Sequence, residues 1–475
     1  MAEADRCPRL RELLEAVGKD PGVVVEEPPE PQVEPSFHRW PRQLDMWPLE
    51  MLMVEAGWKP RPPILRVKEA SAVQRVMKEA SRLGVCVVPR GGGSNVVGSG
   101  YPARCCVLLD LTGLNRVIEF SSDDLYVYVE AGAHISKLEV WLNERGYTLQ
   151  YHPQSSELAT VGGSVSMLGS GAYAPGRGNI EDLVLWLDVV LASGEAVTVG
   201  SRRSPRGWEG PGAKHLFLGA EGGLGVVVAA GLRVRPLPSA AADMAYVMPG
   251  FEEAIEAAKR LTLWGRPSLV RVVDRSEAAL LYGVEGALLL VRLEGDDEQL
   301  LEAEAGYVDR VARSLGGSRR DELFQRWWDT RLRYDEHVAQ LWSAGLWFDT
   351  IDTASYWSLL PRLNRRLLEE LSSVKGVVAA FSHAGHFYAN GGSLYHTVVM
   401  ERSPRVYWRV WETAMKVALE EGAALTHQHG YGILRAKWAR EALGGNYSVY
   451  CRVKEALDPK GVLSPYGLAA GCRCR

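Results

Sequence analysis

Short apolar runs set the pattern of the chain between Ile64 and Pro238. The runs are rich in β-branched residues and are separated by glycine-rich turns, which is typical of strands joined by loops. They are Val85–Pro89, Val107–Leu109, Tyr126–Glu130, Leu185–Leu191 and Val226–Val228. Between them, Ala70–Leu83 and Ser136–Arg145 carry apolar residues at i, i+3 and i+4 spacing, so each predicts a helix with one face against a sheet.

A second pattern, with longer helices, follows two prolines in the stretch Arg235–Ser239. These prolines interrupt the strand pattern and predict a domain boundary. Beyond it, helical patterns at 252–261, 298–315 and 356–374 alternate with strand-like runs at 287–293, 376–381 and 394–399. Such an alternation is typical of helices packed on one antiparallel sheet.

The patterns divide the chain into four predicted segments. A chain of 475 residues is too long for one simple core, so two or three packed units are expected. We predict an N-terminal helical extension at 1–59, an α+β domain at 60–238, a cap domain for the substrate at 239–420 and a C-terminal segment at 421–475 that returns to the first domain.

Composition narrows the class of protein. The formal net charge of −4 offers no basic surplus to nucleic acid. The N-terminus lacks a basic leader followed by an apolar core, and no later stretch has the ~18 uninterrupted apolar residues of a membrane-spanning helix. We expect a soluble, cytoplasmic protein with no nucleic-acid partner.

The seven cysteines are scattered along the chain, which predicts reduced thiols rather than a disulfide framework. Cys472 and Cys474 form a C-x-C pair at the extreme tail. Two interpretations of this pair are open: it is part of a frayed terminus, or it forms a redox or metal-binding pair.

Glycine-rich turns carry the densest signal for binding. Val88–Gly98 follows a predicted strand and holds three consecutive glycines, whose backbone N–H groups can converge on a diphosphate. An ordinary glycine-rich turn is the alternative. Four more Gly/Ser-rich turns lie at 152–155, 160–163, 169–171 and 219–225. Neither G-x-G-x-x-G after the first strand nor G-x-x-x-x-G-K-[ST] is present, so nicotinamide-type and P-loop binding lose support.

The runs PRGGGSNVVGSG, YHPQSSELATVGGSVSMLGSGAYAPGRGNIEDLVLWLDVVLASGE and LFLGAEGGLGVVVAAGLRVRPLP resemble the FAD-binding domain of the vanillyl-alcohol oxidase superfamily. The resemblance covers nearly everything after about Pro60. It implies an α+β fold in which a two-subdomain PCMH-type FAD-binding domain at 60–238 carries an antiparallel-sheet-plus-helices cap. It also implies that the C-terminal segment returns to the FAD site.

In that family the turns listed above embrace the FAD, and we carry those contacts onto matching positions. The implied FAD-binding residues are Pro89, Arg90, Gly91, Gly92, Gly93, Ser94, Asn95, Gln154, Ser155, Thr160, Gly162, Gly163, Ser170, Gly171, Glu221, Gly222, Gly225, Val226 and Val227. Some members bond the flavin to a His or Cys in the first loop. Ser94 stands there in this chain, so we expect non-covalent FAD.

Histidine supplies the acid–base candidates, because its pKa near 6.5 lets it take and give a proton at neutral pH. Five of the ten histidines lie in two clusters, at 382–396 and 426–432. Histidines with only a structural role are the alternative. The FAD-linked 2-hydroxyacid dehydrogenases that bind a divalent metal carry acidic residues that this chain lacks, and Gln428 and Tyr395 stand at two of the metal-motif positions. We therefore assign no metal ligand, and a metal at the histidine cluster stays open as an alternative.

A finer resemblance links residues 345–354, Trp357 and both histidine clusters to the alkyldihydroxyacetonephosphate synthases. Tyr395 matches their signature tyrosine, and Arg271 matches one of their phosphate-binding arginines. His383 stands where the second arginine is found, which weakens a claim on a phosphorylated substrate. The candidate catalytic residues are His429, His427, Tyr395, Arg271, His386 and His383.

Three functions remain open. The first is oxidation of a small 2-hydroxy acid, such as D-lactate or glycolate, with Arg271 on the carboxylate, His429 or His427 as the base and FAD as the hydride acceptor. The second is alkylglycerone-phosphate synthesis with no net redox change. The third is a flavoprotein subunit of an electron-transfer complex. The electron acceptor, peripheral membrane association through residues such as Trp327 and Trp328, and a homodimer are also left open.

Overall fold

The structure is a computed structural model. It describes residues 7–27, 62–101, 105–207, 210–331, 340–341 and 343–472. The predicted extension at 1–59 therefore falls largely outside the described residues. Its described part holds α1 (Pro8–Val17) and β1 (Val23–Glu26), and β1 pairs with β2 (Ile64–Val67) of the next segment.

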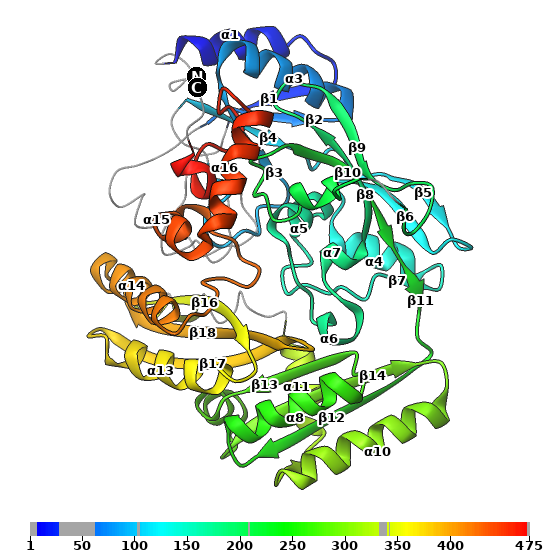
Figure 1. The fold of residues 1–475 in the computed structure, drawn as a ribbon, viewed down its shortest axis with the longest axis vertical. Helices are drawn as coiled ribbons and strands as arrows, with labels where there is room; N and C mark the ends of the chain where they lie inside the picture. Colours follow the sequence, from blue (N-terminus) through cyan, green and yellow to red (C-terminus); the bar gives the residue numbers. More distant parts are fainter. Residues whose placement is uncertain are drawn as a thin grey trace.

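Two larger sheets and a two-stranded sheet of order β11-β7 are found in the described part of the first half of the molecule (Figure 1). One of the larger sheets has the order β1-β2-β4-β3 and packs on α1 and α3, and the other has the order β5-β6-β10-β8-β9. The further elements are α3 (Ala70–Leu83), β3 (Cys86–Arg90), β4 (Cys106–Asp110), β5 (Val117–Ser121), β6 (Tyr126–Glu130), α4 (Ile135–Asn143), β7 (Tyr147–Thr148), α5 (Val161–Met167), α6 (Ala174–Arg177), α7 (Ile180–Leu183), β8 (Val184–Val190), β9 (Ala196–Gly200), η2 (Ala213–Leu216), β10 (Val226–Arg233) and β11 (Arg235–Pro236).

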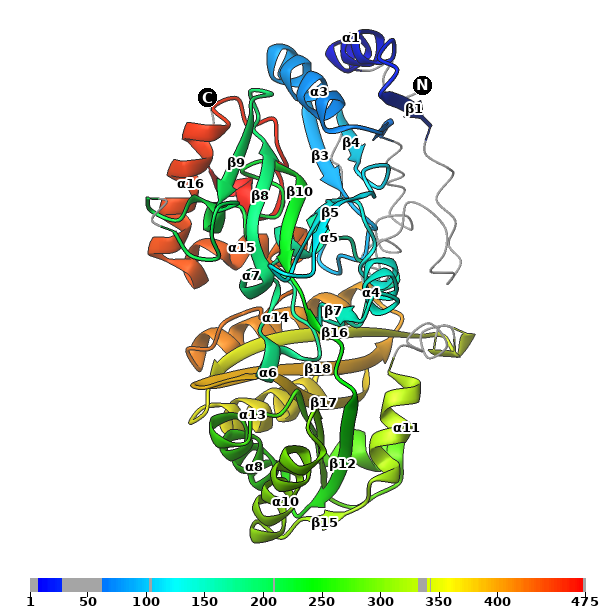
Figure 2. The ribbon, with the colours of Figure 1, turned by 90° about the vertical axis from the view of Figure 1, so that its right-hand side faces the viewer.

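One seven-stranded sheet organises the next part of the chain, in the order β15-β12-β14-β13-β17-β18-β16, with antiparallel pairs throughout. Figure 2 shows it beneath the sheets of the first half. Its elements are β12 (Ala240–Met248), α8 (Phe251–Trp264), β13 (Leu269–Val273), α9 (Arg275–Glu277), η3 (Ala278–Tyr282), β14 (Ala287–Gly295), α10 (Glu298–Ser314), β15 (Ser318–Arg319), α11 (Glu322–Thr330), β16 (Leu346–Tyr356), α13 (Leu360–Ser373), β17 (Val377–Tyr388), β18 (Gly391–Glu401) and α14 (Pro404–Glu420).

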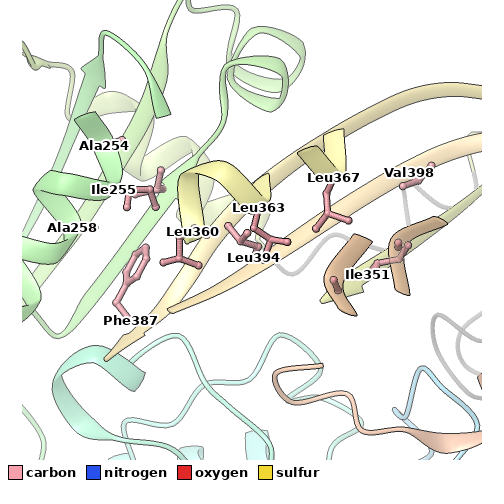
Figure 3. Packing of buried hydrophobic residues seen from close by; sticks show 14 of the residues in the cluster. Ala254, Ile255, Ala258, Ile351, Leu360, Leu363, Leu367, Phe387, Leu394 and Val398 are labelled. Atoms are coloured by element: carbon pink, nitrogen blue, oxygen red, sulfur yellow. The ribbon is translucent and has the colours of Figure 1, made fainter. Parts of the chain in front are cut away.

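The two faces of this sheet differ, because side chains alternate along a strand. On one face, Ile351 and Leu394 pack against helices α8, α13 and α14, as the close view of this core shows (Figure 3). On the opposite face, residues two apart, such as Phe381 and His383 on β17, line a cavity. The alternation therefore gives the sheet a core side and a ligand side.

The last elements return to the first half of the molecule, where α15 (Gly432–Leu443), α16 (Gly445–Leu457) and η4 (Gly467–Gly471) lie beside its sheets (Figure 1). The buried Lys454 fixes this placement, since its Nζ donates to the carbonyls of Gly223 (2.7 Å) and Leu463 (2.6 Å). The loop that carries the second histidine cluster comes directly before α15 and is thereby held at the boundary between the two halves.

The cysteine expectation was wrong. Disulfides join Cys7 to Cys105, Cys86 to Cys106 and Cys451 to Cys472. The spacing along the sequence gives no hint of these pairs, because sheet pairing and helix packing bring the partners together. Cys474 lies outside the described residues.

Trp327 is buried and Trp328 packs beside it, with the guanidinium of Arg331 3.6 Å from the centre of the Trp328 ring. Trp327 therefore belongs to a hydrophobic core, and Trp328 packs against that core. In the described part of the chain, no helix is both long and apolar enough to cross a membrane.

Candidate active site

A cavity of about 1030 Å³ lies between the glycine-rich loops of the first half and the ligand side of the seven-stranded sheet. Most residues singled out from the sequence line it, including Arg271, Tyr395 and His429. The exceptions among the predicted residues are Gly171, Val226 and His427, which lie behind its wall. The fold thus brings residues 89–95 and 427–429 to one site.

The first glycine loop follows β3 and has its amide groups free for a ligand. Within the described residues, none of the N–H groups of Gly91 to Ser94 donates to another backbone group. A Cβ on Gly92 would lie 1.6 Å from the carbonyl oxygen of Leu158, and Gly93 has φ of 72°. Glycine is required at these positions because of close approach and backbone conformation. Free amides in such a loop fit the diphosphate of FAD.

Two side chains, the half-buried Asn95 and the buried Glu221, hold the loops in place. Asn95 Oδ1 accepts from the N–H groups of Val97 (3.0 Å) and Ser99 (2.9 Å), which closes its own turn. Glu221 accepts from the N–H groups of Tyr431 (2.6 Å) and Gly432 (3.0 Å), so it pins the C-terminal segment. The Glu221 carboxylate lies at the cavity wall with both oxygens engaged, and its direct role is to join the loops.

Asp352 organises the second histidine cluster from strand β16. Its fully buried carboxylate accepts from the N–H groups of His427 (2.6 Å) and Gln428 (3.1 Å), and its Oδ1 lies 3.0 Å from Nδ1 of His429. Arg435, also fully buried, reaches the same oxygen at 2.5 Å. Burial alone would raise the pKa of Asp352, but the neighbouring His429 and Arg435 and the hydrogen bonds outweigh it, so the pKa is well below its usual value.

His427 lies between two tyrosines. Its Nε2 is 2.6 Å from the hydroxyl of Tyr388, and its Nδ1 is 3.1 Å from the hydroxyl of Tyr395. Burial lowers the pKa of His427 to about 4, so the ring is neutral at pH 7. Gln428 Nε2 donates to the Tyr395 hydroxyl at 2.8 Å. Burial and the charge of Asp352 raise the pKa of Tyr395 well above 10, so the phenol stays protonated.

Arg271, Glu277 and His383 form a second cluster at the cavity wall. Glu277 Oε1 lies 3.5 Å from Arg271 Nη2, and Glu277 Oε2 lies 3.2 Å from His383 Nδ1. The Nε of Arg271 is buried and has no hydrogen-bond partner in the described part of the protein. A guanidinium with an unused donor at a cavity wall is suited to a carboxylate or phosphate ligand.

His386 belongs to the same wall through a different contact, since its Nδ1 lies 3.0 Å from the carbonyl oxygen of Gly171. The carbonyl can only accept, so Nδ1 carries the proton and Nε2 is the acceptor. Burial and the neighbouring His427 keep the pKa of His386 well below 6.5. Among the described residues, no three His, Cys, Asp or Glu side chains are grouped to hold a metal ion.

Sequence reasoning missed three residues of the site: Asp352, Glu277 and Tyr388. Asp352 lies inside the stretch 345–354 that resembles the synthases, but its separation from the histidines along the sequence follows no helical or strand period. Its contact to the His427 amide spans 75 residues of sequence, and that of Glu277 to His383 spans 106. A helical or strand period cannot reveal contacts at such separations.

Comparison with known proteins gives a consistent picture. Residues 62–200 match the family model of the FAD binding domain, and residues 237–468 match that of the C-terminal domain of FAD linked oxidases. The alkyldihydroxyacetonephosphate synthase of Dictyostelium discoideum is 25% identical over 88% of this chain and 75% of its own length. A D-lactate dehydrogenase of Archaeoglobus fulgidus is 23% identical over 85% of this chain and 90% of its own. The solved structure of p-cresol methylhydroxylase matches 99% of this chain and 97% of its own with a TM-score of 0.74 at 16% identity, a likeness of fold.

Proposed function

We propose a function on the premise that this chain belongs to the FAD-linked oxidases of the vanillyl-alcohol oxidase superfamily and is an FAD-dependent oxidoreductase. It oxidises a small 2-hydroxy acid of the D-lactate or glycolate type to the 2-oxo acid. The observation that carries the proposal is the placement of an arginine and an acid–base cluster on the wall of one cavity. When bound, FAD supplies the acceptor, at N5, for the hydride that leaves the substrate Cα.

The residues of the chain bind and orient the substrate and take its proton. Arg271 lines the cavity and offers the N–H groups of its guanidinium to the substrate carboxylate. His429 lines the cavity with Nδ1 turned to Asp352. Its Nε2 has no hydrogen-bond partner among the described residues and accepts the hydroxyl proton. His427 does not line the cavity and is held by both ring nitrogens, so of the two histidines His429 is the better base.

A steady-state assay tests this proposal. The purified, FAD-loaded protein is mixed with D-lactate or glycolate and an artificial electron acceptor, and both acceptor reduction and 2-oxo acid are measured. We expect equal amounts of 2-oxo acid and of two-electron-reduced acceptor. A broad panel of 2-hydroxy acids that yields neither product would contradict the proposal.

A second candidate, an alkylglycerone-phosphate synthase-like activity, is favoured by the apolar part of the cavity wall. Leu280, Leu281, Trp327 and Phe348 line the cavity, and an aliphatic chain could lie against them. In that reaction an acyl ester is exchanged for an alkyl ether and a fatty acid is released. Incubation with an acyl-dihydroxyacetone phosphate and a fatty alcohol would release free fatty acid from such an enzyme but not from a 2-hydroxyacid oxidoreductase.

A further inference from the structure

We infer that Glu277 sets the charge of the anion site, so that this site takes a singly charged carboxylate and rejects a phosphate or phosphonate dianion. Glu277 is thereby a specificity-determining residue. The inference rests on the proposed function, because it concerns the anionic end of the substrate that Arg271 holds.

The position of Glu277 is fixed by the turn that follows strand β13. Asp274 caps this turn, since its Oδ1 accepts from the N–H of Glu277 at 2.7 Å. Asp274 is in turn tied to β17, because its Oδ2 accepts from the N–H of Ser382 at 2.9 Å. The Glu277 side chain is 5% exposed and lines the cavity, between Arg271 on β13 and His383 on β17. Glu277 cannot swing away without breaking these contacts.

The cluster has a net formal charge of zero. Burial opposes ionisation of Glu277, but His383 and Arg271 outweigh it and keep the pKa of Glu277 below its usual value, so the carboxylate is charged at neutral pH. Burial and the charge of Arg271 lower the pKa of His383, so the imidazole is neutral. The charges of Arg271 and Glu277 therefore balance, and His383 adds none.

A neutral site distinguishes anions by their charge. The free energy of removing an ion from water rises with the square of its charge in a Born description, so a dianion needs far more compensation than a carboxylate of similar size. The guanidinium of Arg271 already faces the Glu277 carboxylate, so it cannot supply the compensation that a dianion needs. Glu277 also repels each negative charge placed on the far side of Arg271, so the second charge of a dianion meets a repulsion that a carboxylate does not. Such a built-in repulsion is an effective way to reject one ligand in favour of another.

The test compares lactate with 1-hydroxyethylphosphonate, which has the same carbon frame and a dianionic head group at mildly alkaline pH. The preference of the wild-type protein for lactate is measured as a ratio of dissociation constants. The constant for lactate comes from the concentration dependence of anaerobic flavin reduction, and the constant for the phosphonate comes from perturbation of the flavin spectrum. We expect Glu277→Gln to lower this ratio by at least about tenfold, mostly through tighter binding of the phosphonate.

Two control variants separate charge from structure. Glu277→Asp keeps the charge and should keep most of the preference. Glu285→Gln removes one negative charge from an exposed position that does not line the cavity, and should leave the ratio unchanged. The absorption spectrum of bound flavin and the melting temperature confirm that each variant is folded and loaded.

The outcomes are distinguishable. If neither ligand perturbs or reduces the wild-type flavin, the proposed function fails and the inference fails with it. If lactate reduces the flavin and Glu277→Gln leaves the preference unchanged, the proposed function stands and the inference is overturned. A wild-type protein that prefers the phosphonate would also overturn it.

Discussion

Asp352 ties the histidine loop to the rigid sheet through a single carboxylate. Its oxygens meet the backbone of residues 427 and 428, the His429 ring and Arg435. A carboxylate behind a histidine fixes the orientation and tautomer of the ring and stabilises the imidazolium that forms when the ring takes a proton. Under the proposed function, Asp352 therefore supports His429 in substrate oxidation.

Asp352→Asn should lower kcat/KM for the hydroxy acid by about 100-fold, because the ring of His429 loses its charged partner. Asp349→Asn is the matched control. Asp349 is a buried carboxylate on the same strand that accepts from Trp411 Nε1 at 2.9 Å on the core side of the sheet. Equal loss of activity in both variants would show that Asp352 has only a structural role.

The buried His396 predicts how stability depends on pH. Its Nε2 lies 3.0 Å from Asn364 Oδ1 on the core side of the sheet, and burial lowers its pKa from 6.5 to about 3. Below pH 6.5 the unfolded chain binds a proton that the folded protein does not, so stability falls as pH falls towards 3. This single site accounts for a loss of about 2 kcal/mol between pH 6.5 and 5.

His396→Gln keeps a hydrogen-bond donor and should reduce the acid-induced loss of stability by that amount. The free energy of unfolding is measured by urea denaturation at both pH values. His215→Gln, at an exposed position, should retain the wild-type pH dependence. An unchanged loss in His396→Gln would mean that this imidazole is not held neutral.

At the scale of elements, the loop after β3 is shaped by its neighbour as much as by the ligand it is suited to hold. Gly91 and Gly92 pass directly against residues 158–160, with no room for a Cβ on either. Two loops distant in sequence therefore form one cradle. A displacement of either loop changes the position of the amide groups that face the cavity.

Gly92→Ala should weaken FAD binding by at least about tenfold, because the new methyl group forces the loop away from Leu158 at an overpacking cost of about 1–3 kcal/mol. The FAD dissociation constant is measured by fluorescence titration of the apoprotein. Gly445→Ala, where a Cβ meets no atom within 4 Å, should bind FAD like the wild type. Wild-type affinity in Gly92→Ala would show that this loop does not position the cofactor.

The regular elements could be predicted from the sequence where a period is visible. Helix α3 begins and ends where the spacing of its apolar residues predicts, and the strand predicted at 394–399 lies inside β18. β16 was missed because buried polar residues stand on both of its faces, Asp349 on the core side and Asp352 on the ligand side, and they hide the apolar alternation. The prediction for β17 ended at residue 381, whereas the strand continues to Tyr388. Its end was missed because histidines on the ligand side interrupt the apolar run.

At the scale of the whole molecule, the site exists only because both halves and the returning C-terminal segment meet. Glu294 on β14 accepts from Gln150 Nε2 (2.6 Å) and from the Tyr173 hydroxyl (2.8 Å), which joins the sheet to the first half. The glycine motif could be found in the sequence, because it is local. The roles proposed for His427, His429 and Arg271 could not be told apart from the sequence, because they follow from contacts between parts of the chain that are distant in sequence.

FAD should stabilise the molecule as a dissociable ligand that lies between its two halves. Denaturation of the purified protein should release all yellow colour into the supernatant, since Ser94 offers no bond to the flavin. Removal of FAD should lower the melting temperature, and its return at a large excess over the dissociation constant should restore it. Flavin that stays with the precipitated chain would contradict non-covalent binding.

The central claim is that Arg271 and His429 present a 2-hydroxy acid to FAD within one cavity. The most direct test is to mix the FAD-loaded protein with D-lactate or glycolate in the absence of oxygen and to record the visible spectrum. The account predicts that the flavin absorbance bleaches in a single phase with formation of one 2-oxo acid per flavin, and that Arg271→Met slows this phase at a given substrate concentration. A flavin that stays oxidised with every 2-hydroxy acid, or that bleaches equally fast in Arg271→Met, would contradict it.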